Sequence, residues 1–112
     1  MYNYRALLER VIDGDSCILR IDLGFRVWIH ERFRLLGIDT PEPNAQDPAV
    51  RTAAIAAKQF LESRLAGQRL FIRSEKLLAT DRYSGWLGMI WREDSEVSVN
   101  EQMIEAGHGR RV

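Results

Sequence analysis

Residues 25–36 read FRVWIHERFRLL, and this stretch decides the fold. Apolar and polar residues alternate from Phe25 to His30, so Phe25, Val27 and Ile29 share one face of an extended chain. A period of two residues is typical of a β-strand with one buried face. We therefore predict a strand over 25–36, with a bend after His30, where the alternation slips.

Two further strands are predicted upstream of this one. Residues 4–12 (YRALLERVI) and 16–22 (SCILRID) are rich in apolar and β-branched residues, and the tight segment 13–15 (Asp-Gly-Asp) separates them. Leu23-Gly24 makes a turn before the third strand. Three consecutive strands joined by such short turns predict an antiparallel meander.

The order of elements beyond residue 36 completes the fold prediction. All three prolines lie in 40–48, which predicts a loop. The later elements expected are a helix capped by Asp47, starting at Pro48 and ending at Gly67, strands at 68–76 and 86–92 around a turn at about 79–85, and a short helix capped by Asn100 and closed by Gly107. Five strands with a helix after the third predict an α+β, mainly β domain over residues 1–112. The architecture expected for this domain is an OB-type five-stranded Greek-key barrel with a short C-terminal helix.

Composition narrows the class of protein. The chain has 112 residues, 46% hydrophobic and 29% charged, with a formal net charge of zero, as expected for one globular domain and not for a dedicated basic nucleic-acid binder. Residues 51–92 are nevertheless basic, with eight Lys/Arg against three Asp/Glu. The lone Cys17 excludes an internal disulfide, and no apolar run is long enough for a membrane span. The N-terminus lacks a signal-peptide core, so a cytoplasmic protein is the default expectation, or a secreted one if a signal was removed.

Two segments carry residues suited to chemistry. Asp13-Gly14-Asp15 ends a strand, and carboxylates at a tight turn are ligands for hard cations such as Ca²⁺. Read alone, it is better explained as a plain hairpin turn, since Asp-Gly is common there. Residues 34–42 (RLLGIDTPE) place an arginine on a strand and two carboxylates at its exit. The alternative reading of that segment is a surface salt bridge with a proline that ends the strand.

Taken together, these segments resemble the staphylococcal (micrococcal) nuclease family, the thermonuclease-like domains. The resemblance rests on IDGDS at 12–16, RLLGIDTPE at 34–42, TDRY at 80–83 and WLGMIW at 86–91, and it covers about residues 6–110. It implies an OB barrel that hydrolyses single-stranded or denatured DNA and RNA with Ca²⁺. The expected partners are therefore nucleic acids and not membranes, and a monomer is the default expectation.

The resemblance also implies roles for individual residues. Asp15 and Asp39 match the calcium carboxylates, Thr40 matches the residue that offers its carbonyl oxygen, and Asp13 matches an acid just behind the metal. Glu42 matches the general base, Arg34 matches one of two phosphate-binding arginines, and Arg82 and Tyr83 match residues beside the nucleotide phosphate.

The second phosphate-binding arginine of the family falls on Gly85, which has no side chain. Losing one preorganised donor of this kind costs about 10²–10³-fold in rate. The sequence therefore predicts a weakened nuclease, and a rise in activity on Gly85→Arg would show that this arginine is what the site lacks. The alternative is a non-catalytic OB-fold module that binds nucleic acid or protein through a degenerate nuclease site.

Overall fold

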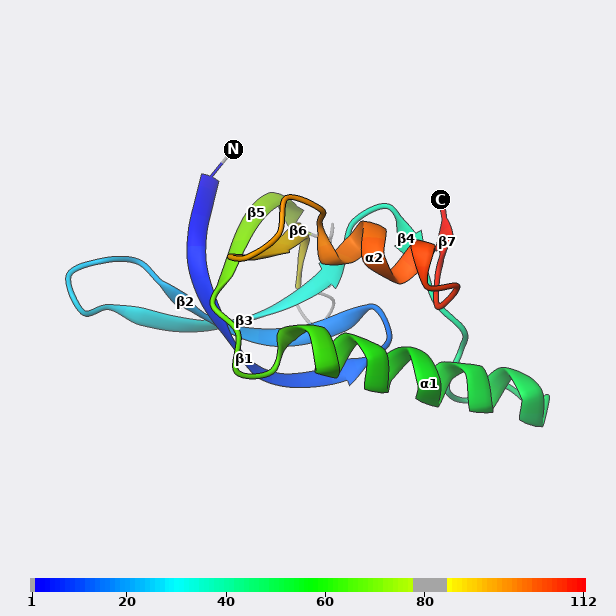
Figure 1. The fold of residues 1–112 in the computed structure, drawn as a ribbon. Helices are drawn as coiled ribbons and strands as arrows, with labels where there is room; N and C mark the ends of the chain where they lie inside the picture. Colours follow the sequence, from blue (N-terminus) through cyan, green and yellow to red (C-terminus); the bar gives the residue numbers. More distant parts are fainter. Residues whose placement is uncertain (1, 78–84) are drawn as a thin grey trace.

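The computed structural model describes residues 2–77 and 85–112, drawn as a ribbon in Figure 1. Most of the turn expected at about 79–85 falls outside these residues. The elements in chain order are β1 (Tyr2–Asp13), β2 (Ser16–Asp22), β3 (Trp28–Leu35), β4 (Ile38–Asp39), α1 (Pro48–Leu65), β5 (Leu70–Leu77), β6 (Trp86–Arg92), α2 (Val99–Glu105) and β7 (Arg110–Arg111). The bounds of β2 and β6 are those predicted from the sequence.

Five strands form a closed barrel in the order β1-β2-β3-β6-β5. The pairs β1–β2, β2–β3, β5–β6 and β1–β5 are antiparallel, whereas β3 and β6 run parallel, with Phe33 opposite Trp86. The three-strand meander and the closure by two later strands confirm the predicted OB-type barrel. The parallel β3–β6 pair is the seam of the barrel, and it brings the end of β3 next to Gly85.

The core fills the barrel and continues under the helices. Its largest fully buried side chains are Phe33, Leu19, Leu35, Ile38, Leu61, Leu65, Leu70, Ile72, Ile90 and Met103. The strand members of this set face inward at alternate positions, as period-two patterning requires. Cys17 is fully buried among them, as a small apolar residue.

Helix α1 begins where the sequence predicted. The carboxylate of Asp47 accepts a hydrogen bond from Ala49 N at 2.9 Å, and Pro48 occupies the first turn. The helix buries one face made of Ala54, Ala57, Leu61 and Leu65, and it lies along one side of the barrel in Figure 1. Within the described parts of the chain, neither helix combines the length and apolar character that a membrane span requires.

The third strand is shorter than predicted. It starts at Trp28, because Phe25 and Arg26 take positive φ angles of 55° and 65° and form the tip of the β2–β3 hairpin. Backbone hydrogen bonds between Leu23 and Val27 and from Val27 to Gly24, each 2.9 Å, close this turn. The apolar alternation through Phe25 and Val27 is therefore coincidental, and Phe25 is fully exposed.

Helix α2 is capped by Ser98 and not, as predicted, by Asn100. Ser98 Oγ accepts a hydrogen bond from Glu101 N at 3.1 Å, the Ser-x-x-Glu spacing of a capping box. Asn100 lies inside the helix, 2% exposed, and its side chain bridges three backbone groups. It accepts from Ile90 N at 3.1 Å and donates to Leu36 O at 2.9 Å and Gly88 O at 3.1 Å.

A second, two-stranded sheet lies beside the barrel, and the sequence did not predict it. β4 pairs antiparallel with β7, with Asp39 opposite Arg110, at the edge where the chain ends in Figure 1. Arg111 joins this sheet to α2 through an ion pair with Glu101 at 2.7 Å. This sheet holds the carboxylate of Asp39 in place at the exit of the barrel.

Candidate active site

The β1–β2 turn packs tightly against the segment that follows β4. A Cβ atom at Gly14 would lie 2.9 Å from both Thr40 Oγ1 and Ala57 Cβ, so any side chain there would push the turn away. Glycine therefore allows the turn to approach the side chains of Thr40 and Ala57 closely. This approach brings Asp13 and Asp15 next to Thr40, as the sequence predicted for a shared site.

Arg34 lies between two carboxylates from different strands. Its Nη2 atom is 3.5 Å from Asp15 Oδ2 and 3.4 Å from Asp39 Oδ1. The backbone fixes this arrangement, because Leu35 N donates to Asp15 O at 2.9 Å and Ser16 pairs with Arg34 across β2 and β3. Since one nitrogen atom contacts both carboxylates, their oxygen atoms converge on one point in space.

Asp15 is the most buried carboxylate of the site, with the residue 8% exposed. Burial, then a hydrogen bond to Asp13 and the charge of that residue, raise the pKa of Asp15 from 3.8 to about 6. The charge of Arg34 and a hydrogen bond with Thr40 act in the opposite direction. Such a carboxylate is costly to ionise on its own, and a further nearby cation would favour its charged form.

The residues that converge here line a cavity with a volume of about 150 Å³, and Glu42 is part of its lining. Asp15, Asp39, Thr40, Arg34 and Glu42 all line it. Glu42 is exposed, and among the side chains described in residues 3–74 and 85–112 its carboxylate has no hydrogen-bond or ion-pair partner. It is thus an unpaired carboxylate on the same cavity as the two converging aspartates.

The donor set fits a hard divalent cation. Asp15 and Asp39 offer carboxylate oxygens that already share one cationic neighbour, Arg34, and Thr40 lines the same cavity. No cluster of three or more His, Cys, Asp or Glu able to hold a metal occurs in the described residues. A cation here would therefore complete its coordination with the Thr40 carbonyl, water and substrate oxygens, as is usual for ions that bind phosphates.

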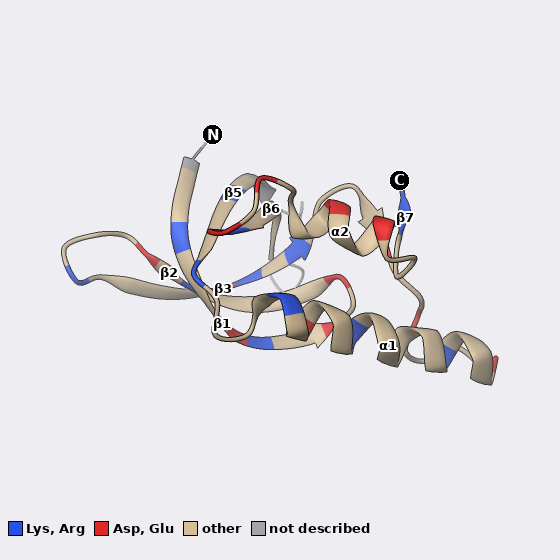
Figure 2. Ribbon diagram, in the orientation of Figure 1, with Lys and Arg blue, Asp and Glu red and all other residues tan. Residues whose placement is uncertain are grey.

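The structure also adds to the candidate site two arginines that sequence reasoning missed. Arg110 Nη2 is 3.4 Å from Asp39 Oδ2, and Arg32 lines the cavity two residues before Arg34. Figure 2 shows blue segments at the end of β3 and in β7, and red segments at the β1–β2 turn and in the loop after β4. The alternation of β3 would have placed Arg32 on the face of Arg34. Arg82 and Tyr83 lie outside the described residues.

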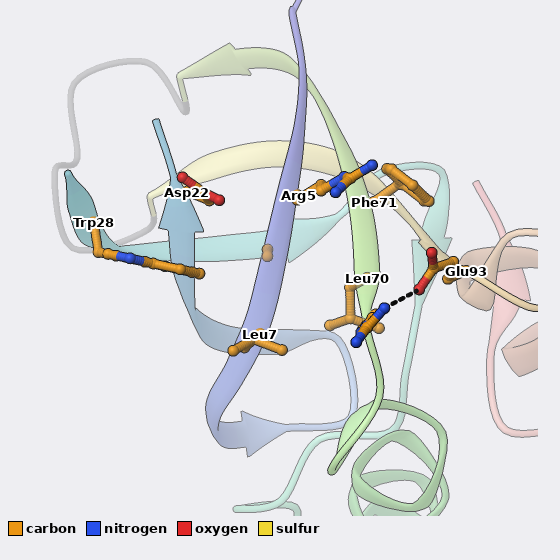
Figure 3. A pocket seen from close by; sticks show the side chains of 9 residues that line it. Arg5, Leu7, Asp22, Trp28, Leu70, Phe71 and Glu93 are labelled. Atoms are coloured by element: carbon orange, nitrogen blue, oxygen red, sulfur yellow. Dashed lines mark ion pairs between the residues drawn. The ribbon is translucent and has the colours of Figure 1, made fainter. Parts of the chain in front are cut away.

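A separate cavity of about 190 Å³ lies away from these residues, among the strands drawn in Figure 3. Arg5 stacks over Phe71 with 5.8 Å between the guanidinium carbon and the ring centre. Asp22 and Glu93 also line the cavity, and Glu93 forms an ion pair of 3.9 Å with Arg69. Two arginines, Arg5 and Arg69, and two carboxylates line this cavity, so their charges balance and do not favour a nucleic-acid backbone.

Asp15→Asn is expected to raise the free energy of unfolding at about pH 8 in the presence of chelator. The folded-state pKa of Asp15, about 6, exceeds the ordinary 3.8, so the folded state binds more protons and loses stability as pH rises between these values. Two pKa units correspond to about 3 kcal/mol, and the lost ion pair with Arg34 offsets part of this gain.

Urea unfolding measures this effect. We expect the variant to be more stable than the wild type by about 1–2 kcal/mol at about pH 8. The difference should largely disappear near pH 3, where the wild-type carboxyl is mostly protonated in both states. Equal stability of the two proteins at both pH values would contradict this account of Asp15.

The fold and the cavity together define a class of protein. It consists of OB barrels in which two converging carboxylates, a guanidinium group suited to phosphate and an unpaired carboxylate line one cavity. Comparison with known proteins then identifies the family. Residues 32–112 match the family described as Staphylococcal nuclease homologue, and the chain belongs to this family.

Two curated relatives support the same assignment. The chain is 33% identical over 93 residues to a Thermonuclease of Staphylococcus intermedius, covering 83% of this chain and 52% of that protein. It is 29% identical over 101 residues to a Thermonuclease of Staphylococcus hyicus, covering 90% of this chain and 55% of that protein. The chain thus spans about half the length of the curated relatives it matches.

Proposed function

We propose that this chain is a calcium-dependent nuclease that hydrolyses phosphodiester bonds of DNA and RNA in single-stranded or denatured form. The observation that carries the proposal is the contact of Arg34 Nη2 with both Asp15 and Asp39, at 3.5 and 3.4 Å, with the free carboxylate of Glu42 on the same cavity. Membership of the nuclease family supports it.

In the proposed reaction, Glu42 takes a proton from the attacking water molecule while the oxygen of this water forms a bond to phosphorus. The bond between phosphorus and the 5′ oxygen breaks, and this oxygen leaves with a proton from solvent. Arg34 donates hydrogen bonds to the phosphate oxygens, where negative charge accumulates. Asp15, Asp39 and the Thr40 carbonyl would hold Ca²⁺, which supplies additional positive charge at the phosphate when bound. Asp13 lies next to Asp15 and shares a hydrogen bond with it, without binding the cation itself.

A rate below that of relatives with two phosphate-binding arginines forms part of the proposal. Gly85 offers no side chain, so the second donor must come from elsewhere in the chain or be missing. One missing donor lowers the rate by about 10²–10³-fold.

Glu42→Gln tests the role of the base. Cleavage of heat-denatured DNA with excess Ca²⁺ should fall by about 10²–10⁴-fold, since this is the usual contribution of a general base. Glu62→Gln makes the same chemical change on the exposed face of α1 and should cut like the wild type. Chelator should abolish cleavage in every variant.

Two results would count against the proposal. Equal activity of Glu42→Gln and the wild type would remove the assigned base. A folded wild-type chain that binds denatured DNA but leaves it intact with Ca²⁺ would instead support the non-catalytic binding module.

A further inference from the structure

Arg32 and Arg34 lie on the same outer face of β3. The strand alternates, so that Phe33 and Leu35 are buried in the barrel while Arg32 and Arg34 remain half-exposed. Both arginines line the cavity that contains Asp15 and Glu42. The candidate active site therefore contains two guanidinium groups from one rigid strand, although the sequence assigned a role only to Arg34.

The two guanidinium groups differ in what they contact. Arg34 is neutralised by Asp15 and Asp39. Arg32 has no carboxylate partner among the side chains described, in residues 3–74 and 85–112, and its Nε atom is buried without a hydrogen-bond acceptor. A buried N–H group without an acceptor is unfavourable unless a ligand supplies one. A positive charge with a free N–H beside a cavity is suited to an anionic oxygen, and a guanidinium group matches phosphate geometry well.

Arg32 is also the residue nearest to the position where an arginine was expected. A Cβ atom built on Gly85 would lie 2.9 Å from the Cβ of Arg32 and 2.0 Å from its carbonyl oxygen. The two residues precede Phe33 and Trp86, which face each other across the β3–β6 seam. The side chain of residue 32 therefore begins close to the point where a side chain on residue 85 would begin.

We propose that Arg32 is the second phosphate-binding residue of this site, donating N–H groups to oxygen atoms of the phosphodiester that is cleaved. The proposal rests on the nuclease function proposed above. Arg34 is already held by the carboxylates, whereas no described carboxylate holds Arg32, which lines the same cavity. The second guanidinium group would thus come from residue 32 in β3 and not from residue 85, which precedes β6. Gly85 leaves room for the Arg32 backbone.

Arg32→Gln tests this role in DNA cleavage. We expect kcat to fall by about 10²-fold with a smaller change in KM, because the donor acts on charge that develops during the reaction. Arg32→Lys should retain an intermediate rate, since it keeps the charge but loses the guanidinium fork. Arg69→Gln is the matched control, because Arg69 has an 84% exposed side chain and lines the separate cavity. Thermal unfolding verifies that each variant is folded.

Binding of a short single-stranded oligonucleotide in chelator separates this proposal from the nuclease function. Loss of one phosphate contact should weaken binding about tenfold and reduce the salt slope, d log K/d log[salt], by about 0.7. If the wild type does not cut but Arg32→Gln binds more weakly and Arg69→Gln does not, the nuclease function fails and the phosphate contact stands. If folded Arg32→Gln cuts and binds like the wild type, or if Arg69→Gln alone is impaired, Arg32 has no such role.

Discussion

Gly85→Arg is expected to unfold the protein and not to restore nuclease activity. A gain would be expected if the missing side chain were the only difference, because the second arginine of the family falls on this position. The structure argues against a gain: a Cβ at residue 85 would lie 2.0 Å from Arg32 O and 2.6 Å from Arg32 C, atoms of a neighbouring backbone. Gly85 also has a φ angle of +76°, which L-residues adopt at a cost of about 1–2 kcal/mol.

The backbone overlap adds to this strain, because β3 and β6 must separate to relieve it. We expect a loss of at least about 4 kcal/mol in the free energy of unfolding, a large part of the total for a domain of this size. Urea unfolding measures it. Gly24→Arg is the matched control, since Gly24 has a φ of +81° but no atom within 4 Å of its Cβ position. If both variants lose the same small amount, the close approach of Arg32 and Gly85 is wrong.

Asn100→Leu is expected to cost about 3–5 kcal/mol in the free energy of unfolding. The Asn100 side chain makes three hydrogen bonds to backbone groups of Ile90, Gly88 and Leu36. Leucine is of similar size but leaves these groups without partners in a buried place, and each unsatisfied group costs about 1–3 kcal/mol. Chemical denaturation should show a lower midpoint at unchanged slope.

A second substitution in α2 controls for helix effects. Glu105→Leu alters an exposed residue at the end of the same helix and should change stability by less than about 0.5 kcal/mol. Because Asn100 holds the Leu36 carbonyl, just before β4 and Asp39, the leucine variant should also lose activity at temperatures where it remains folded. A midpoint equal to that of Glu105→Leu would show that this network contributes little.

Much of the fold follows from the sequence, since it depends on long periodic segments. The strand at 16–22, the strand at 86–92 and the start of α1 at Pro48 lie as predicted, because apolar alternation and a cap residue mark them. The β2–β3 turn was missed because two non-glycine residues, Phe25 and Arg26, adopt positive φ. Strands of two residues, such as β4 and β7, have no period to detect.

Some residues of the candidate site could likewise be predicted from the sequence, and others could not. Asp15, Asp39, Arg34 and Glu42 belong to two short motifs, and the meander brings them together as expected. Arg110 could not be assigned, because its contact with Asp39 spans 71 residues and depends on the β4–β7 pair. Arg32 looked like any polar residue on an alternating strand until the seam placed Gly85 against it.

The parallel seam between β3 and β6 has a consequence for the kinetics of folding. The meander β1–β2–β3 consists of contacts between neighbours in sequence, which form early, whereas the seam joins segments separated by α1 and β5. Closing so long a loop is entropically costly and slow. An intermediate with a formed meander would carry Asp15 and Arg34, but it would lack the β4–β7 pair that holds Asp39 and the closed wall beside Arg32. The proposed nuclease activity is therefore expected to appear only in the last folding step.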